Sequence, residues 1–337
     1  MLQYRVGIFM NNIKKYKVLI TDYAWPNLDI ENSILSNIAE IIVAPDTNTD
    51  TLKKLVSNVD VIMFNWAEIP EHVIREAKQC IQLSRFGVGI DNIPVKLATE
   101  LGMLVTNIPD YCVDEVTDQA MALILSLNRQ ILYFSKQTNI NLNSPVSRLR
   151  NQTLGLLGFG RQGSLMAKKG RSFGMNIITF DPFIPDSVLK TEKVDRVEFD
   201  ELLSNSDFLS IHTPLNEDTK GLLGLNEFKK MKPTSYIVNV ARGGIIQTNA
   251  ITEALKENII AGAGLDVTEP EPLPDDHPLR TLKNAILTPH TAFFSQESLQ
   301  ELSRRTAQQV KDVLEGKLPE NLRNPEVLNN SRKSFSN

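Results

Sequence analysis

The chain has 337 residues, a length that favours two domains over one. Hydrophobic residues make up 42% and charged residues 23% of it, which is the balance of an ordinary globular protein and excludes a disordered or fibrous chain. The formal net charge is -4 and there is no long basic run, so a nucleic-acid partner bound through its phosphates is not expected.

The number of cysteines and the length of the apolar runs indicate the cellular compartment in which the protein is expected. Only Cys80 and Cys112 are present, which excludes a disulfide framework, and no cysteine–histidine cluster has the spacing of a zinc site, so we expect no metal. No apolar run approaches the ~20 residues of a membrane helix, and the apolar block near the N-terminus is shorter than a signal-peptide core. We therefore expect a cytoplasmic protein without a membrane partner, in which residues 1–12 are an appendage to the first strand.

Strand and helix signals alternate through the first third of the chain. Strands are predicted at residues 18–21, 41–44, 61–64, 83–86 and 104–106, with helical patterns between them such as 50–56 and 71–78. This alternation predicts a parallel, doubly wound sheet. The turn after the first strand, residues 21–26, has no phosphate-binding glycine pattern, so this unit is predicted not to bind the nucleotide.

The second part of the chain repeats the same architecture. A long helical pattern starts at Asp114, and a loop is predicted at residues 139–146. Further strands are predicted at residues 208–211, 236–239, 263–266 and 285–287, and a long amphipathic helix follows at 296–314. Packing of that helix on the first unit would make the first domain discontinuous. The polar tail, residues 329–337, is predicted to be loose.

A glycine-rich turn in the second unit has the pattern of a dinucleotide site. An apolar strand at residues 154–157 leads into Gly158, Gly160 and Gly163, and a helical pattern follows. Gly158 permits a tight turn, Gly160 lets the backbone approach a pyrophosphate, and Gly163 lets the helix lie close to the strand. The pyrophosphate then binds at the helix N-terminus. A second strand ends on Asp181, about twenty residues on, where an acid accepts hydrogen bonds from the ribose hydroxyls.

The residues after Asp181 bear on the choice between NAD and NADP. Pro182 and Phe183 follow it, and neither is a cation that would bind a 2′-phosphate. An acid without a basic neighbour repels that phosphate and binds the ribose hydroxyls, so the predicted cofactor is NAD.

Three ionisable residues follow predicted strands of the second unit. Arg242 comes after the strand 236–239, Asp266 ends the strand 263–266, and His290 follows the strand 285–287. Ligands bind beyond the carboxyl ends of parallel strands, so these residues are expected at one edge. Each of them alone is more often structural than catalytic, and their combination carries the prediction.

At these residues the sequence resembles the D-isomer-specific 2-hydroxyacid dehydrogenases. The resemblance lies in the motifs at residues 239–244, 264–272 and 288–290 and in a substrate-loop segment at 85–92, and it covers about residues 18–327. Residues 108–112 and 290–295 are more similar to the branch that contains the C-terminal binding proteins and their bacterial relatives.

The resemblance implies an α/β fold of two doubly wound, Rossmann-like domains with a cleft between them. The substrate domain would comprise residues 1–107 and 293–337, and the NAD-binding domain residues 108–292. It also implies a homodimer, and the long helix at 296–314 is the candidate for the dimer contact.

The same resemblance implies roles for individual residues. His290 would be the acid/base at the substrate oxygen, Glu271 would pair with it, and Arg242 would bind the carboxylate and keto oxygen. Arg161 and Gln162 would contact the pyrophosphate. The remaining implied contacts are Thr213 on the adenosine side, Val240 and Ala241 on the nicotinamide side, Asp266 at the nicotinamide carboxamide, and the Val88 and Gly89 N–H groups at the substrate carboxylate.

The substrate's side chain is expected to face Asn65, Trp66 and Phe293, with Phe86 as a second bulky neighbour. Residues 65–68 contain no arginine or lysine, which weighs against phosphoglycerate and favours a 2-keto acid with an apolar or aromatic side chain. The leading hypothesis is a reversible NAD(H)-dependent 2-hydroxyacid dehydrogenase. The alternatives are an NADH-responsive protein-binding scaffold resembling a corepressor, and hydride transfer involving a substrate other than a 2-hydroxy acid, such as phosphite or formate.

Overall fold

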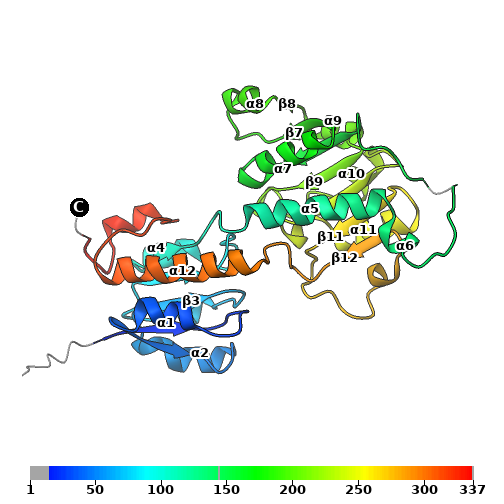
Figure 1. The fold of residues 1–337 in the computed structure, drawn as a ribbon. Coiled ribbons are helices and arrows are strands. Elements are labelled where there is room, and N and C mark those ends of the chain that lie inside the picture. Colours follow the sequence, from blue (N-terminus) through cyan, green and yellow to red (C-terminus); the bar gives the residue numbers. More distant parts are fainter. Residues whose placement is uncertain (1–14, 143–144, 336–337) are drawn as a thin grey trace, which may run out of the picture. The chain divides into compact units, whose positions relative to one another are not determined.

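The computed structural model describes residues 15–142 and 145–335. The predicted appendage at residues 1–12 lies outside them. The described chain forms two compact units, each built on its own parallel sheet (Figure 1). One unit extends to Tyr111 and takes up the chain again from Leu299, and the other runs from Cys112 to Ser298. No helix of the described residues is long and apolar enough to cross a membrane.

The first unit has a five-stranded sheet in the order β2-β1-β3-β4-β5, and every neighbouring pair is parallel. Its strands are β1 (Tyr16–Ile20), β2 (Ala39–Val43), β3 (Val61–Phe64), β4 (Gln82–Arg85) and β5 (Leu104–Thr106). Its helices are α1 (Asp29–Leu35), α2 (Thr49–Leu55), α3 (Glu71–Glu76), α4 (Val95–Glu100) and most of α12 (Gln296–Leu314).

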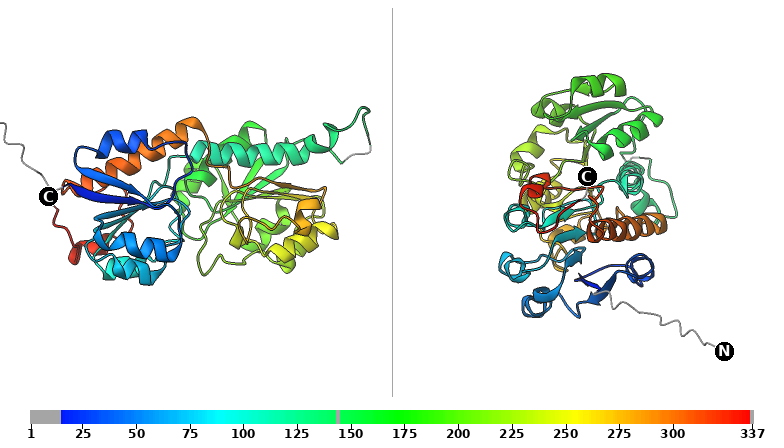
Figure 2. Two further views of the ribbon diagram at one scale, coloured as in Figure 1. Left: turned by 90° about the horizontal axis from the view of Figure 1, so that it is seen from below. Right: turned by 90° about the vertical axis from the view of Figure 1, so that its left-hand side faces the viewer.

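Both faces of this sheet are covered, which explains why its strands are apolar without alternation. Val18, Leu19 and Ile20 are consecutive in β1 and all are fully buried. Helices lie on both sides of the sheet (Figure 2). On one side, side chains of α2, α3 and α4 join the strands in one hydrophobic cluster.

The second unit has a seven-stranded parallel sheet in the order β12-β11-β10-β9-β6-β7-β8. Its strands are β6 (Thr153–Leu157), β7 (Asn176–Phe180), β8 (Asp195–Arg196), β9 (Phe208–Ile211), β10 (Tyr236–Asn239), β11 (Gly262–Leu265) and β12 (Ala285–Leu287). Its helices are α5 (Val113–Asn128), α6 (Ile131–Phe134), α7 (Arg161–Ser172), α8 (Asp186–Glu192), α9 (Phe199–Asn205), α10 (Leu225–Lys230) and α11 (Thr248–Lys256).

Each strand order reverses direction at one point, and such a point is where open α/β sheets bind ligands. In the first sheet the reversal lies between β1 and β3, and in the second it lies between β6 and β9. A ligand-binding site is therefore expected at the loops that follow the carboxyl ends of these four strands.

The predicted fold class of two doubly wound parallel sheets is confirmed. The strand β8 was missed, because only Asp195 and Arg196 form it and both are exposed polar residues without an apolar signal. The predicted domain boundaries fell after residue 107 and after residue 292, whereas the compact units divide after Tyr111 and after Ser298. The assignment of one unit to substrate and the other to cofactor stays a prediction at this stage.

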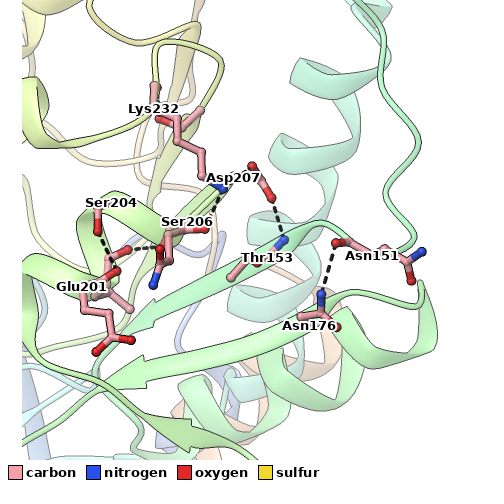
Figure 3. A network of polar contacts seen from close by, with 11 residues as sticks. Asn151, Thr153, Asn176, Glu201, Ser204, Ser206, Asp207 and Lys232 are labelled. Carbon is pink, nitrogen blue, oxygen red and sulfur yellow. Dashed lines mark hydrogen bonds and ion pairs between the residues drawn. The ribbon is translucent and has the colours of Figure 1, made fainter.

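The amino ends of the second sheet are tied together by polar contacts (Figure 3). Asp207 accepts a hydrogen bond from the Thr153 N–H at 2.8 Å, and its other oxygen pairs with Lys232 Nζ at 2.7 Å. Nearby, the Asn176 side chain donates to the Asn151 carbonyl at 3.1 Å. These contacts fix the end of the sheet opposite the glycine turn, so they serve the fold.

The prediction that the C-terminal tail is loose is wrong for its described part. The Arg332 guanidinium donates to the carbonyls of Ala77 and Cys80, at 2.7 and 2.8 Å. Lys333 Nζ donates to the Leu314 carbonyl at 2.7 Å. Polar side chains that satisfy carbonyls at loop and helix ends hold the tail on the first unit, although its sequence has no apolar pattern.

Candidate active site

The glycine turn after β6 has the geometry that its sequence predicts. Gly158 has a φ of +96°, which glycine adopts at little cost, and its N–H donates to the Phe180 carbonyl at 3.0 Å. A Cβ added to Gly163 would lie 2.3 Å from the Gly158 carbonyl oxygen, so only glycine lets α7 approach β6 this closely. A Cβ on Gly160 would meet nothing within 4 Å.

The open space at Gly160 lies at the N-terminus of α7, a helix of 12 residues for which Gly160 is the N-cap. The free N–H groups and the positive dipole end of a helix stabilise a phosphate there. The residues present therefore fit a dinucleotide pyrophosphate: the glycine leaves the room, and Arg161 in the first turn adds a cation.

Asp181 connects the glycine turn to the loop after β7. One of its oxygens accepts the Phe159 N–H at 2.8 Å, and the other accepts the N–H groups of Phe183 and Ile184 at 2.9 and 3.2 Å. The carboxylate is thus held in a fixed orientation by three backbone donors. It lies beyond β7, which neighbours β6 in the sheet, as the position of a ribose-binding acid requires.

An arginine does lie near Asp181, although none directly follows it in the sequence, where Pro182 and Phe183 stand. Arg196 of β8 donates to the carbonyls of Asp181 and Ile184 and pairs with Asp186 at 3.1 Å. Its guanidinium hydrogen-bonds to these oxygen atoms and so stabilises the loop that follows β7. The expectation of no basic neighbour was therefore incomplete, because β8 brings Arg196 beside β7 from fifteen positions further along the chain.

His212 lies under the glycine turn, where a Cβ on Gly158 would come within 3.0 Å of its backbone. Its Nε2 is 2.8 Å from Ser210 Oγ. Burial of the ring disfavours the charged form and lowers the pKa of His212 to about 4, so the ring is neutral at physiological pH. It therefore adds no charge beside the glycine turn, and the next residue, Thr213, is partly exposed.

His290 and Glu271 form a pair in the second unit. His290 Nδ1 lies 2.5 Å from Glu271 Oε1, and the two side chains are 23% and 38% exposed. A carboxylate at this distance fixes the tautomer and the orientation of an imidazole. The ring of Phe293 meets the His290 ring edge to face, with centroids 6.2 Å apart.

Asp266 holds the turn that carries His290. Its carboxylate is almost fully buried and accepts the Thr288 hydroxyl at 2.6 Å and the N–H groups of Thr291 and Ala292 at 3.0 and 2.9 Å. His290 itself has a φ of +51°, an uncommon conformation for a residue with a side chain. The hydrogen bonds to Asp266 compensate the cost of that conformation and keep the imidazole in place.

Arg242 lies on a turn after β10 that Asn239 fixes. The Asn239 amide donates to the Arg242 carbonyl at 2.8 Å and accepts the Ala241 N–H at 3.0 Å. The next residue, Gly243, approaches Thr268 so closely that a Cβ there would lie 2.0 Å from the Thr268 carbonyl oxygen. This contact joins the turn of Arg242 to the loop that leads to Glu271. Strands β10, β11 and β12 are neighbours, so Arg242, Asp266 and His290 follow adjacent strand ends.

The substrate residues predicted in the first unit follow β3 and β4. Asn65 is buried, Trp66 is 46% exposed, and Val88 and Gly89 are partly exposed. Phe86 was expected to flank the substrate, and that expectation is wrong. Its side chain is fully buried and packs edge to face on Trp25, with ring centroids 4.8 Å apart.

Sequence reasoning missed three residues that hold these loops: Arg196, Thr288 and Asp22. Asp22 accepts the backbone N–H groups of Asn65, Trp66 and Ala67 at 3.0, 2.6 and 3.1 Å. Its position just after a predicted strand was the one available signal. Among the described residues, no group of three or more His, Cys, Asp or Glu side chains forms a metal site.

A family model matches residues 121–292, and its description is the NAD binding domain of the D-isomer specific 2-hydroxyacid dehydrogenases. The chain is 37% identical over 318 residues to a D-3-phosphoglycerate dehydrogenase of Methanocaldococcus jannaschii, covering 91% of this chain and 59% of that protein. It is 35% identical over 268 residues to a glyoxylate reductase of Korarchaeum cryptofilum, covering 77% of this chain and 81% of that protein. The chain thus spans less than two thirds of the first relative and most of the second.

Among solved structures, a D-lactate dehydrogenase from Aquifex aeolicus, complexed with NAD and lactic acid, superposes with a TM-score of 0.83 and 26% sequence identity. The superposition covers 91% of this chain and 98% of that one. The family model and the NAD complex of this neighbour identify the cofactor as NAD. The chain belongs to the D-isomer-specific 2-hydroxyacid dehydrogenases, a family of NAD-dependent oxidoreductases.

Proposed function

We propose that this protein interconverts a 2-keto acid and a D-2-hydroxy acid with NAD(H). The observation that carries this proposal is the His290–Glu271 pair at 2.5 Å, on a turn that the buried Asp266 holds. A positioned imidazole with a carboxylate partner is suited to move a proton to and from a carbonyl oxygen. The adjacent strand ends carry Arg242, a guanidinium that suits planar oxyanions.

In the direction of reduction, His290 donates its proton from Nε2 to the keto oxygen, because Nδ1 is engaged with Glu271. Glu271 holds the imidazole in this orientation through its contact with Nδ1. Arg242 binds the carboxylate and the keto oxygen and polarises the carbonyl. Bound NADH supplies the hydride that reaches the keto carbon, and oxidation reverses both transfers.

The proposed cofactor contacts follow the loops of the second unit. Gly158, Gly160 and Gly163 with Arg161 and Gln162 hold the pyrophosphate, and Asp181 accepts the ribose hydroxyls. Thr213 lines the adenosine side, and Val240 and Ala241 line the nicotinamide side. Asp266 keeps acceptor capacity at Oδ2, which takes one N–H from Ala292, for the carboxamide of the nicotinamide.

For the substrate, we propose that the N–H groups of Val88 and Gly89 bind the carboxylate, and that Asn65, Trp66 and Phe293 contact the side chain. No arginine or lysine occurs at residues 65–68, so a phosphate group would lack a cation in that loop. This feature favours a small or apolar 2-keto acid, such as glyoxylate or pyruvate, over a phosphorylated one.

The test is NADH oxidation by the purified protein with a panel of 2-keto acids of increasing side-chain size, and with formate and phosphite plus NAD. We expect turnover of small or apolar 2-keto acids. Tight binding of NADH without turnover of any panel member would instead support the NADH-responsive scaffold. Turnover of formate or phosphite alone would favour a substrate that is neither a 2-keto acid nor a 2-hydroxy acid.

Asp181→Ala is expected to raise the Kd of NADH by about 10-fold or more and to reduce the preference for NADH over NADPH. The variant removes the acceptor of the ribose hydroxyls, and it also frees the Phe159, Phe183 and Ile184 N–H groups, at a cost of roughly 1–3 kcal/mol. The measurement is the Kd of both cofactors by fluorescence titration. Asp186→Ala, in the same loop region but paired with Arg196, is the control. Unchanged discrimination in Asp181→Ala would remove Asp181 from this role.

We also propose that the protein is a homodimer. Five large hydrophobic side chains are exposed in and after α6: Ile131, Leu132, Tyr133, Ile140 and Leu142. Exposed apolar groups concentrated in one segment are typical of protein interfaces. The apolar side chains Leu302, Val310 and Val313 of α12 are buried, which leaves that helix little apolar surface for a partner. Light scattering of the intact protein measures the molecular mass.

A further inference from the structure

Two loops of the first unit follow the neighbouring strands β3 and β4. They differ in which of their backbone groups, N–H or C=O, are hydrogen-bonded within the protein. The loop after β3, residues 65–67, uses its N–H groups on Asp22. Its carbonyls are taken as well, because the Asn92 side chain donates to those of Asn65 and Ala67 at 3.4 and 3.3 Å. This loop has no backbone donor left for a ligand, so any contact to substrate must come from its side chains.

In the loop after β4, residues 87–89, all three carbonyls accept a hydrogen bond, whereas of the three N–H groups only that of Gly87 donates one, to the Arg85 carbonyl at 3.1 Å. Ile108 N–H donates to the Gly87 carbonyl at 3.0 Å, Asn107 Nδ2 to the Val88 carbonyl at 2.5 Å, and Arg85 Nη1 to the Gly89 carbonyl at 2.7 Å. Within the described chain, the N–H groups of Val88 and Gly89 donate to no protein acceptor.

A trans peptide places its C=O and N–H on opposite sides, so a donor that holds the carbonyl also sets the direction of the N–H. Asn107 holds the Val88 carbonyl and thereby turns the Gly89 N–H away from the body of the unit. The backbone of Ile108 does the same for the Val88 N–H. Two N–H groups that point the same way form a small concave donor site for an anion.

Arg85 and Asn107 are themselves held firmly. Both are almost fully buried. Arg85 spans the two loops, because its Nε also donates to the Asn65 carbonyl at 3.2 Å. The Asn107 carbonyl accepts the Gln309 side chain of α12 at 3.1 Å. Gly87 is needed between them, since a Cβ there would lie 2.6 Å from Arg85 Nη1.

We propose that Asn107 is a positioning residue that directs the Gly89 N–H toward the substrate carboxylate, beside the Val88 N–H that the Ile108 backbone orients. Arg85 supports this arrangement as a second positioning residue, because it holds the Gly89 carbonyl at the end of the loop and bridges to the loop that Asp22 anchors. This inference rests on the proposed function and deepens it. Selectivity for carboxylate over an uncharged group then depends on two buried side chains that do not touch the substrate.

The test compares Asn107→Asp and Arg85→Gln with the intact enzyme, using oxalate as the probe of the carboxylate site. Asn107→Asp replaces the donor at the Val88 carbonyl with a charged acceptor, which favours rotation of that peptide. We expect the inhibition constant of oxalate and the KM of the 2-keto acid to rise about 10- to 100-fold, as for loss of a charge-assisted hydrogen bond. The Kd of NADH should change less than about twofold, because the second unit is untouched.

Gln82→Glu is the matched control. Gln82 is also a buried amide, lies at the amino end of β4, and donates to Thr106 Oγ1. It undergoes the same amide-to-carboxylate change without contacting the loop at 87–89, so oxalate inhibition should be retained. If Asn107→Asp fails to fold, Asn107→Ser and Arg85→Lys, which keep a donor, provide graded versions of the same test.

The two proposals fail in different ways. If the intact protein turns over no 2-keto acid and oxalate does not compete, the proposed function itself is wrong. If the intact protein is active and inhibited by oxalate, but the variants at residues 85 and 107 keep the same oxalate inhibition, the positioning roles are wrong and the enzyme assignment stands. A parallel loss in Gln82→Glu would show a general effect of destabilisation and would also overturn the inference.

Discussion

His290→Ala is expected to lower kcat for reduction of a 2-keto acid by about 10²- to 10⁴-fold, the usual contribution of a general acid. The alanine removes the proton donor and leaves the Asp266 hydrogen bonds to the turn in place, since these involve the backbone of Thr291 and Ala292 and the Thr288 hydroxyl. NADH affinity should therefore stay nearly unchanged. Stopped-flow reduction and a fluorescence titration of NADH measure the two quantities separately.

Two further variants sharpen this test. Glu271→Gln keeps a side chain that can hydrogen-bond to His290 Nδ1 but removes the negative charge, so kcat should fall by a smaller factor than in His290→Ala. His72→Ala changes an exposed histidine of the first unit and should leave kcat as it is. Loss of NADH binding in His290→Ala, or equal rates in His290→Ala and the intact protein, would refute the acid/base role.

Gly160→Ala is expected to raise the Kd of NADH by about 5- to 150-fold, corresponding to roughly 1–3 kcal/mol of overpacking against the pyrophosphate. A Cβ at this position meets no protein atom within 4 Å, and the φ of Gly160, -74°, suits alanine. The melting temperature of the protein without cofactor should therefore stay close to that of the intact protein. Isothermal titration and thermal unfolding give the two values.

Gly163→Ala is the contrasting variant in the same turn. Its Cβ would lie 2.3 Å from the Gly158 carbonyl oxygen, so α7 must move and the fold should lose stability even without cofactor. A drop in melting temperature for Gly163→Ala but not for Gly160→Ala would separate packing from cofactor contact. If Gly160→Ala binds NADH as tightly as the intact protein, the pyrophosphate does not lie against Gly160.

Much of the fold followed from local sequence patterns. The predicted strands 61–64, 104–106, 208–211, 236–239 and 285–287 coincide with β3, β5, β9, β10 and β12. Strands buried on both faces are continuous apolar runs, and such runs are visible without knowledge of the partners. The glycine turn was equally visible, because the conformations of Gly158 and Gly163 are requirements of the chain within a few residues.

Some residues of the candidate site were also visible in local sequence motifs, and others were not. The sequence named Arg242, Glu271 and His290 through short motifs, and the pairing of His290 with Glu271 connects residues on neighbouring loops. It did not reveal that Asp266 holds the His290 turn, nor that Asp22 takes every N–H of residues 65–67. Those roles depend on which strand ends become neighbours, and the strand order is not a local property.

By itself, the sequence determined the two α/β units, the glycine turn and the residue types of the candidate proton-transfer site, since each rests on a local pattern. Only the tertiary structure decided that Phe86 belongs to the core, that Arg196 donates to the loop of Asp181, and that Asn107 and Arg85 donate to the carbonyls of the loop at 87–89. The physical reason is that a hydrogen bond or a packing contact depends on distance in space, and folding brings together side chains that the sequence keeps far apart.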